Sequence, residues 1–453
     1  MGSGPAESSQ RTLGLGSASA IVLATIIGSG IFTTTGKVGP SLVSEFNIYA
    51  VWVVCALLAL CGALTMGELG AMHPRSGGGY AFVNRGFGAR SSAFVGLQTL
   101  LFGYPISIGI ISLVMGGYLN DVLPWCPPEL SAGLVVIVIT LLNCRSTALG
   151  AGANNLGTVL KVLVIGTFII GGLAVAAPES TTVEQQASTA DLVAPGLLSA
   201  TFAAAVAQVI FSFNGWGAVT VVGGEIRNPH RNLPLGILLA LGLSTILYIL
   251  INVVFLRSAP PTAMLDADGQ PTNTIGYFAA ERLFPEWVAE ALSWGIVVLL
   301  VSTLLSVILT GGRWGYAMAR HGQFPRLFGT RNEKGAPVAA LLLQCVISLG
   351  LVFSTSITTL LILAGITGLL SRSIMIASVF ALRVREPGVE RPFKVPLYPL
   401  PPLLFILLSL WIAWQTAMAD RAILISSSVI IGGTLVASLI IGRRQTTPDP
   451  DLN

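Results

Sequence analysis

Charge is scarce in this sequence: Asp, Glu, Lys and Arg together make up 10% of its 453 residues, whereas globular domains contain about a quarter. Histidine is limited to three residues, all between apolar runs, and the five cysteines show no C-x-x-C spacing. These counts argue against a metal site and against a catalytic triad. We therefore predict no enzyme activity, no catalytic residues, no metal and no cofactor.

Long apolar runs fill most of the chain, which is 53% hydrophobic with a mean hydropathy of +0.81. A membrane-spanning helix needs about 20 mostly apolar residues, and such runs recur from residue 12 to residue 441. The sequence thus predicts an all-α integral membrane protein with twelve transmembrane helices. They are expected at residues 13–35, 48–69, 93–119, 130–144, 156–176, 197–222, 235–256, 287–310, 338–353, 358–382, 403–419 and 423–441.

Most of the 24 lysines and arginines fall between spans on one side of the membrane if the N-terminus lies inside. Positive residues mark the cytoplasmic side, so we predict two cytoplasmic tails, residues 1–11 and 443–453. The acidic, Ser/Thr-rich residues 177–194 become an external loop. Residues 257–286 form a longer external segment, which either folds over an entrance or is a plain linker.

Glycines interrupt two of the predicted spans. The stretch IIGSGIFTTT, residues 26–35, carries Gly-Ser-Gly at 28–30 inside the first apolar run. Small residues there either let membrane helices pack closely or break the helix. The stretch FSFNGWGAV, residues 211–219, repeats the feature in the sixth span. Five spans apart, the two segments cross the bilayer in opposite directions, which is typical of inverted-repeat transporters with a midplane site.

The two interruptions would expose complementary backbone groups. Non-helical backbone survives at membrane depth only where protein or a polar cavity satisfies its freed groups. Unwinding at residues 28–30 frees N–H groups at the start of a half-helix, which favours a carboxylate. Unwinding at residues 212–215 frees carbonyls that accept from an ammonium group. Together the breaks predict a site for a zwitterionic amino acid.

Two basic residues lie within spans, where an ionisable side chain indicates function by default. Lys161, in LGTVLKVLVIGTF, either snorkels toward the cytoplasm or donates to carbonyls freed in the first span, as a sodium ion would elsewhere. Whether it couples transport to protons stays open. Arg372, in GLLSRSIMI, is expected to have a structural partner or to snorkel rather than to contact substrate.

Two polar motifs between spans are predicted to lie on the cytoplasmic side. HPRSGGGYAF, residues 73–82, is expected to seat a re-entrant turn of an inner gate. In GEIRNPHRNLP, Asn232 would cap the seventh span with Pro234 in its first turn. Glu225 alternatively forms an ion pair of the inner gate.

Taken in order along the chain, these motifs resemble the amino acid–polyamine–organocation superfamily, and within it the L-type amino acid transporters and their bacterial relatives. The resemblance covers nearly the whole sequence. The matching motifs are IIGSGIF (26–32), GELGAMHPRSGGGYAF (67–82), LKVLVIG (160–166), FSFNGWGAV (211–219), GEIRNPHRNLP (224–234), ARHGQFPRLF (319–328) and RPFKVPLYP (391–399).

The resemblance implies a LeuT-type fold with five plus five inverted spans, discontinuous helices 1 and 6, two further helices, and alternating access. The first repeat would then cover residues 12–176 and the second repeat residues 195–385. Spans 11 and 12, with the cytoplasmic loop before them, would occupy residues 386–442.

The resemblance also assigns roles to residues. The substrate carboxylate would bind the peptide groups at 28–30, and its amino group would meet carbonyls near 211–213. Phe211 corresponds to an aromatic gate followed by Trp216, and Lys161 to a lysine associated with sodium-independent transport. The predicted substrate-binding residues are Ile27, Gly28, Ser29, Gly30, Phe211, Ser212, Phe213, Asn214, Gly215, Thr303 and Ser306.

We therefore predict a secondary active transporter of neutral L-amino acids in a bacterial inner membrane, either a sodium-independent exchanger or a uniporter. The alternatives are a transporter of cationic amino acids or polyamines and a non-transporting membrane sensor of amino acids. The expected partners are the substrate and the lipid bilayer, without nucleic acid. Cys126 lies where animal heteromeric relatives bond to a glycoprotein subunit, a partner that we do not expect here.

Overall fold

The structure is a computed structural model that describes residues 12–73, 78–145, 148–175 and 193–442. These residues form helices joined by turns, and two isolated β-bridges are the only strand pairing recorded among them. The tails, the core of the predicted external loop and part of the HPRSGGGYAF motif lie outside the described residues. An all-α fold is thus confirmed for the described part of the chain.

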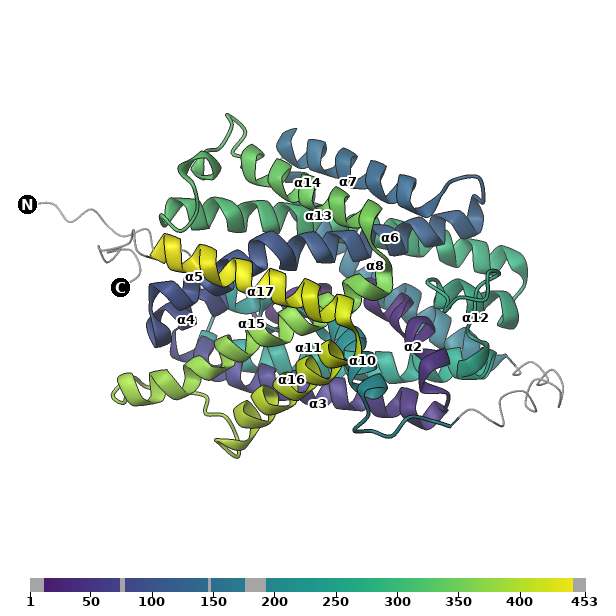
Figure 1. The fold of residues 1–453 in the computed structure, drawn as a ribbon, viewed down its shortest axis with the longest axis horizontal. Helices are drawn as coiled ribbons and strands as arrows, with labels where there is room; N and C mark the ends of the chain where they lie inside the picture. The colour runs from purple at the N-terminus through teal and green to yellow at the C-terminus, as the bar shows by residue number, and fades with distance from the viewer. Residues whose placement is uncertain (1–11, 74–77, 146–147, 176–192, 443–453) are drawn as a thin grey trace, which may run out of the picture.

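The elements follow one another along the chain as Figure 1 shows. Their bounds are α1 Leu15–Ile26, η1 Gly30–Phe32, α2 Thr34–Leu42, α3 Glu45–Met72, α4 Gly78–Phe87, α5 Ala89–Gln98, η2 Thr99–Gly103, α6 Tyr104–Val122, α7 Pro128–Arg145, α8 Ala148–Ala174, α10 Ala200–Val209, η3 Ile210–Phe213, η4 Ala218–Glu225, α11 Pro229–Ser258, η5 Pro261–Ala263, α12 Ile275–Leu283, α13 Glu286–Arg320, η6 Arg326–Gly329, α14 Val338–Ser354, α15 Ile357–Arg385, α16 Leu400–Ala419 and α17 Arg421–Gly442.

Within the described ranges, eight helical stretches are long and apolar enough to cross a membrane. The other predicted spans, the first, fifth, sixth and ninth, correspond to shorter apolar helices. Two of these four, the first and the sixth, are the spans with glycine interruptions. The count of twelve spans and the cytoplasmic position of both termini stay predictions.

Several helices begin where the sequence supplies a capping hydroxyl. The side chain of Ser44 accepts from the Asn47 N–H at 3.2 Å and starts α3, and Ser199 starts α10 in the same way. Such a hydroxyl satisfies one of the N–H groups that lack partners in a first helical turn. The capping prediction for Asn232 is wrong, because α11 already begins at Pro229.

Both Gly-interrupted segments depart from α-helical geometry. The helix α1 ends at Ile26, and the chain continues through the short 3₁₀ turn η1 into α2. The helix α10 ends at Val209 and continues through the 3₁₀ segments η3 and η4. A third irregularity was not predicted: η2 is a π-helical stretch between α5 and α6, a feature that often marks functional sites.

The helices run roughly alongside one another, and two short helices lie at opposite ends of the bundle (Figure 1). The helix α4 and the last turns of α17 lie at one end, and α12 lies at the other. Because α12 belongs to residues 257–286, that segment is not a plain linker. In the described part of the chain, α1 and α10 pack against neighbours on several sides, so both breaks lie inside the protein.

A buried carboxylate joins elements at the end where α4 lies. Glu68 is fully buried and accepts from Arg383 at 2.9 and 2.6 Å and from the Val395 N–H at 2.7 Å. An ion pair at Glu225 was one of the two alternatives for the GEIRNPHRNLP motif; there the structure records a backbone bond from Leu13 N to the Glu225 carbonyl at 3.0 Å. Sequence reasoning missed Glu68 because Arg383 lies 315 residues away.

Candidate functional site

The first break presents a row of backbone donors. Around it, backbone hydrogen bonds are donated by the N–H groups of Ile27, Phe32 and Thr33. Among the described residues, the N–H groups at positions 28–30 have no hydrogen-bond acceptor. A Cβ placed on Gly28 would meet no atom within 4 Å. The first break therefore combines three successive unpaired donors with open space beside the first of them.

The second break presents acceptors. The Phe211 carbonyl accepts from the Asn214 N–H at 3.1 Å, and the Gly215 carbonyl accepts from the Ala218 N–H at 2.9 Å. The Phe213 carbonyl has no donor among the described residues. Gly215 has φ = 121°, a conformation that favours glycine. The glycine is thus required by the backbone turn that frees this carbonyl.

The two breaks touch at two points. A Cβ on Gly30 would lie 2.8 Å from the Cα of Ser212, so only glycine permits this approach. On the side of α1, the Thr25 hydroxyl lies 3.2 Å from the Gly215 carbonyl and 2.8 Å from the Val22 carbonyl, both within donating distance. Predicted site residues from both breaks, Gly30, Ser212 and Gly215, are therefore brought together.

Tyr248 of α11 connects the breaks from one side. Its hydroxyl lies 2.9 Å from the Ile26 carbonyl and 3.0 Å from the Ser212 carbonyl. Its ring packs against those of Trp52 and Phe213, with centroids 5.2 and 5.3 Å away. A carbonyl at the end of α1 lacks an intrahelical donor, and this hydroxyl supplies one. Sequence reasoning missed Tyr248 because a single tyrosine in an apolar run gives no local signal.

Lys161 of α8 reaches the first break. Its side chain is buried, and its Nζ donates to the Ala24 carbonyl at 3.2 Å. Ala24 lies in the last turn of α1, where carbonyls have no helical donor. Of the two alternatives for Lys161, this contact supports donation to the broken span and not snorkelling.

The breaks are more accessible from one side than from the other. Toward α2, Ser29 and the threonines at 33–35 are fully buried. Toward α1 and η4, Thr25 is exposed, and Asn214 and Gly215 are partly exposed. The side of the breaks toward α2 is therefore buried, and the side toward α1 and η4, called the open side below, is partly exposed.

The predicted gate residues lie in different surroundings. Phe211 is 9% exposed within η3. Trp216 packs against Phe405 of α16, with ring centroids 6.2 Å apart, and it also lies against Gly62 of α3. That packing places Trp216 against the neighbouring helices α3 and α16.

Thr303 and Ser306 of α13 are not brought into hydrogen-bond contact with either break. Thr303 donates to the Leu299 carbonyl of its own helix at 2.8 Å. The Ser306 hydroxyl is buried without a partner among the described residues. Their assignment to the substrate site stays a prediction.

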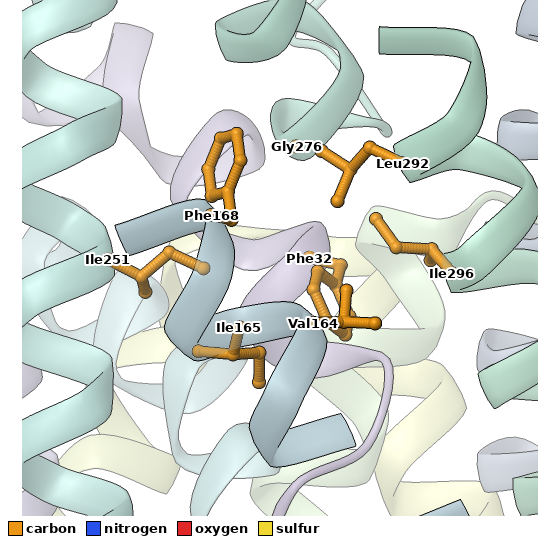
Figure 2. Close-up of a pocket in the computed structure, with 8 residues that line it drawn as sticks. All are labelled: Phe32, Val164, Ile165, Phe168, Ile251, Gly276, Leu292 and Ile296. Atoms are coloured by element: carbon orange, nitrogen blue, oxygen red, sulfur yellow. The ribbon is translucent and has the colours of Figure 1, made fainter. Parts of the chain in front are cut away.

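A small apolar pocket lies beside the first break, and Figure 2 shows its lining. Phe32 of η1 faces hydrocarbon side chains of α8, α11 and α13 there, and Gly276 of α12 completes the lining. Such a lining does not suit a zwitterion. The pocket therefore offers no polar side chain to a substrate.

Tyr118 of α6 joins this region to α12. Its fully buried hydroxyl donates to the Phe32 carbonyl at 2.7 Å and accepts from the Gly276 N–H at 2.9 Å. One hydroxyl thus satisfies a carbonyl of the first break and an N–H in the first turn of α12.

Paired interrupted helices inside a bundle of apolar helices, one with unpaired donors and the other with free acceptors, define a polytopic membrane protein of the transporter class. The match of the amino acid permease family to residues 13–437 shows that this chain belongs to that family. The family and the relatives found are transporters rather than enzymes.

Three relatives illustrate the similarity. The mouse b(0,+)-type amino acid transporter 1 is 28% identical over 428 residues, covering 91% of this chain and 84% of its own length. The human large neutral amino acids transporter small subunit 2 is 28% identical over 424 residues, covering 89% and 76%. The serine/threonine exchanger SteT of Bacillus subtilis is 28% identical over 418 residues, covering 91% and 92%. A bacterial relative of nearly full coverage fits a bacterial cell membrane.

Cys126, the residue considered for a partner subunit, is a partly exposed free cysteine in the turn between α6 and α7. The Asn120 side chain donates to its carbonyl at 3.1 Å.

Proposed function

We propose that this protein is a secondary transporter of neutral L-amino acids that works by alternating access, as a sodium-independent exchanger or a uniporter. The observation that carries the proposal is the row of unpaired N–H groups at 28–30 facing a break with a free carbonyl at Phe213. The first set suits a carboxylate and the second suits an ammonium group.

The chemistry of the breaks favours a zwitterion without further charge. A hydrogen bond to a charged group contributes about 1.5–3 kcal/mol, so two or three backbone contacts give a useful affinity. A buried charge without a partner is heavily penalised. No Asp or Glu side chain forms a hydrogen bond or an ion pair with the breaks among the described residues, and the buried Glu68 is paired with Arg383. This supports neutral amino acids over cationic amino acids or polyamines.

The contact of Lys161 with the first break supports sodium independence. An ammonium group that donates to the Ala24 carbonyl supplies positive charge where a bound cation would otherwise be needed. The name of the Bacillus subtilis relative, a serine/threonine exchanger, supports exchange and small substrates. The pH dependence of the transport rate tests whether protons are coupled to transport.

Alternating access requires a site that opens to one side at a time. The unequal exposure of the breaks, with Thr25 accessible and Ser29 buried, fits one end of such a cycle. We place the five plus five inverted spans at residues 12–176 and 195–385, with both termini in the cytoplasm.

The test is counterflow in proteoliposomes. Wild-type protein loaded with unlabelled alanine, serine or leucine should accumulate the labelled amino acid in sodium-free buffer. Absence of counterflow with every neutral amino acid would overturn the proposal, and binding without flux would indicate a sensor. Counterflow of lysine or a polyamine alone would favour the cationic alternative.

A substitution tests the role of the lysine. Lys161→Ala should insert normally but lose most transport, because the Ala24 carbonyl loses its donor. The exposed Lys334→Ala serves as the matched control and should behave like wild type. Sodium-stimulated transport by the wild type would contradict the sodium-independent mechanism.

A further inference from the structure

Arg372 lies near the middle of α15, the helix Ile357–Arg385. At 1.5 Å per residue it is about 20 Å from either end of that helix. A charge at this depth is costly and normally faces the bundle interior or a water-filled cavity. Arg372 is partly exposed. The neighbouring elements show which way its exposed surface faces.

The helical register of α15 directs Arg372 toward the second break. Gly365, two turns earlier, lies against the backbone of Ala207 in α10. Met375, three residues later, lies against Gly79 of α4. Residues seven apart, and residues three apart, share one face of an α-helix. Arg372 therefore points between α10, which ends at the second break, and α4.

The guanidinium is directed toward the level of the breaks. A Cβ built on Gly368 would lie 2.8 Å from one Nη of Arg372 and 3.5 Å from its Cζ. The side chain therefore folds back over Gly368, one turn toward the start of α15, and away from Arg383. Snorkelling toward the nearer basic end, expected from the sequence, would require the opposite direction.

The expected structural partner is also missing. Across the ranges that the structure describes, no hydrogen bond or ion pair involves the Arg372 guanidinium. Arg383 on the same helix shows the contrast, because it forms a two-pronged bond with Glu68. An interior guanidinium without an anion is unfavourable. The unpaired group therefore indicates an anionic ligand that binds reversibly.

We propose that Arg372 binds a carboxylate of the transported amino acid on the open side of the breaks. The inference rests on the proposed transport function and extends it to a second anion contact. Guanidinium and carboxylate form paired, charge-assisted hydrogen bonds. The carboxylate is the α-carboxylate of the substrate, at the point where it leaves the donors at 28–30. The same charge repels cationic side chains.

Three variants test the contact. Arg372→Gln removes the charge and Arg372→Lys keeps it. Gly368→Ala leaves the arginine itself unchanged but forces its guanidinium to move. Alanine also raises helix propensity by about 1 kcal/mol, so the last variant should fold even if Arg372→Gln does not. The matched controls are Arg385→Gln, exposed on the same helix, and Gly432→Ala, where a Cβ meets nothing.

The measurement is KM and kcat in proteoliposomes of known orientation, with alanine and with glutamate supplied from the open side of the breaks. We expect Arg372→Gln to raise KM about tenfold or more, Gly368→Ala to raise it severalfold, and Arg372→Lys to restore much of the loss. A rise for alanine supports the contact with the α-carboxylate, and a rise for glutamate alone would overturn it.

Unchanged KM for both substrates in Gly368→Ala and in whichever Arg372 variant inserts would overturn the inference. So would equal losses in Arg372→Lys and Arg372→Gln, or a requirement for chloride, which would indicate an inorganic anion. Failure of the transport function itself is distinguishable, because the wild type would then show no counterflow of alanine.

Discussion

The two breaks differ in what they offer and in how tightly they are held. The first, at residues 28–30, offers unpaired N–H groups and has open space at Gly28. The second offers carbonyls and is fixed by the positive φ of Gly215. A zwitterion needs both kinds of group, so neither break alone makes a site. The difference shows that the glycines serve two purposes. Some let two backbone segments approach closely, and others leave space beside backbone N–H groups.

The largest effect is expected at the fixed break. Gly215→Ala places a side chain at φ = 121° with its Cβ 2.7 Å from the backbone of Thr25. Strain and overpacking together should destabilise the protein by about 3 kcal/mol and abolish transport. The measurement is the midpoint of thermal unfolding in detergent together with counterflow.

The matched control is Gly217→Ala, where the nearest atom to a new Cβ is a methionine carbon at 3.7 Å and φ is −83°. If both variants unfold at the same temperature, the contrast between fixed and open glycines does not hold for the second break.

A somewhat smaller loss is expected where the breaks meet. Gly30→Ala puts a Cβ 2.8 Å from the Cα of Ser212, so the two segments have to separate. Overpacking of this kind costs about 1–3 kcal/mol. Thermal unfolding should shift downward and transport should be lost. A stable, active Gly30→Ala protein would show that the breaks do not need this contact.

The bridge between the breaks should contribute less. Tyr248→Phe removes the hydroxyl that lies against the carbonyls of Ile26 and Ser212 but keeps the ring packing. Leaving a buried carbonyl without a donor should cost about 1.5 kcal/mol. The unfolding midpoint and the KM of counterflow measure the effect. Tyr277→Phe, partly exposed in α12, is the control, and equal shifts in both variants would argue against the bridge.

The smallest effect on stability is expected at Gly28. A Cβ there meets nothing within 4 Å, and its φ lies outside the left-handed region. Gly28→Ala should therefore change the unfolding free energy by no more than about 0.5 kcal/mol. The methyl group would nevertheless occupy space beside the N–H groups, so KM should rise and the ligand-induced thermal shift should shrink. Normal substrate binding would place the carboxylate elsewhere.

The sequence predicted the features that local chemistry determines. The glycines at 28, 30 and 215 indicated interrupted spans, and the structure shows 3₁₀ segments at both places. Contact with the first break was one of the two alternatives for Lys161, and its side chain reaches the Ala24 carbonyl. In these cases a residue type that is costly in an apolar helix marks its own position.

Long-range contacts could not be predicted in the same way. The pairing of Glu68 with Arg383 depends on how α3 and α15 pack. The span ending at Thr310 in the prediction continues to Arg320 as α13, since polar residues outside an apolar run still support a helix. Tyr248 and Tyr118 bond to backbone groups of other helices, and the amino-acid sequence does not indicate which backbone groups they reach.

The hydroxyl of Tyr118 has a mechanical consequence. Because it holds the Phe32 carbonyl and the Gly276 N–H at once, α12 and the end of the first break are tied to a common pivot on α6. A movement that lifts α12 must either carry η1 with it or rupture a water-shielded bond. Movement of α12 and rearrangement of the first break are thereby mechanically coupled.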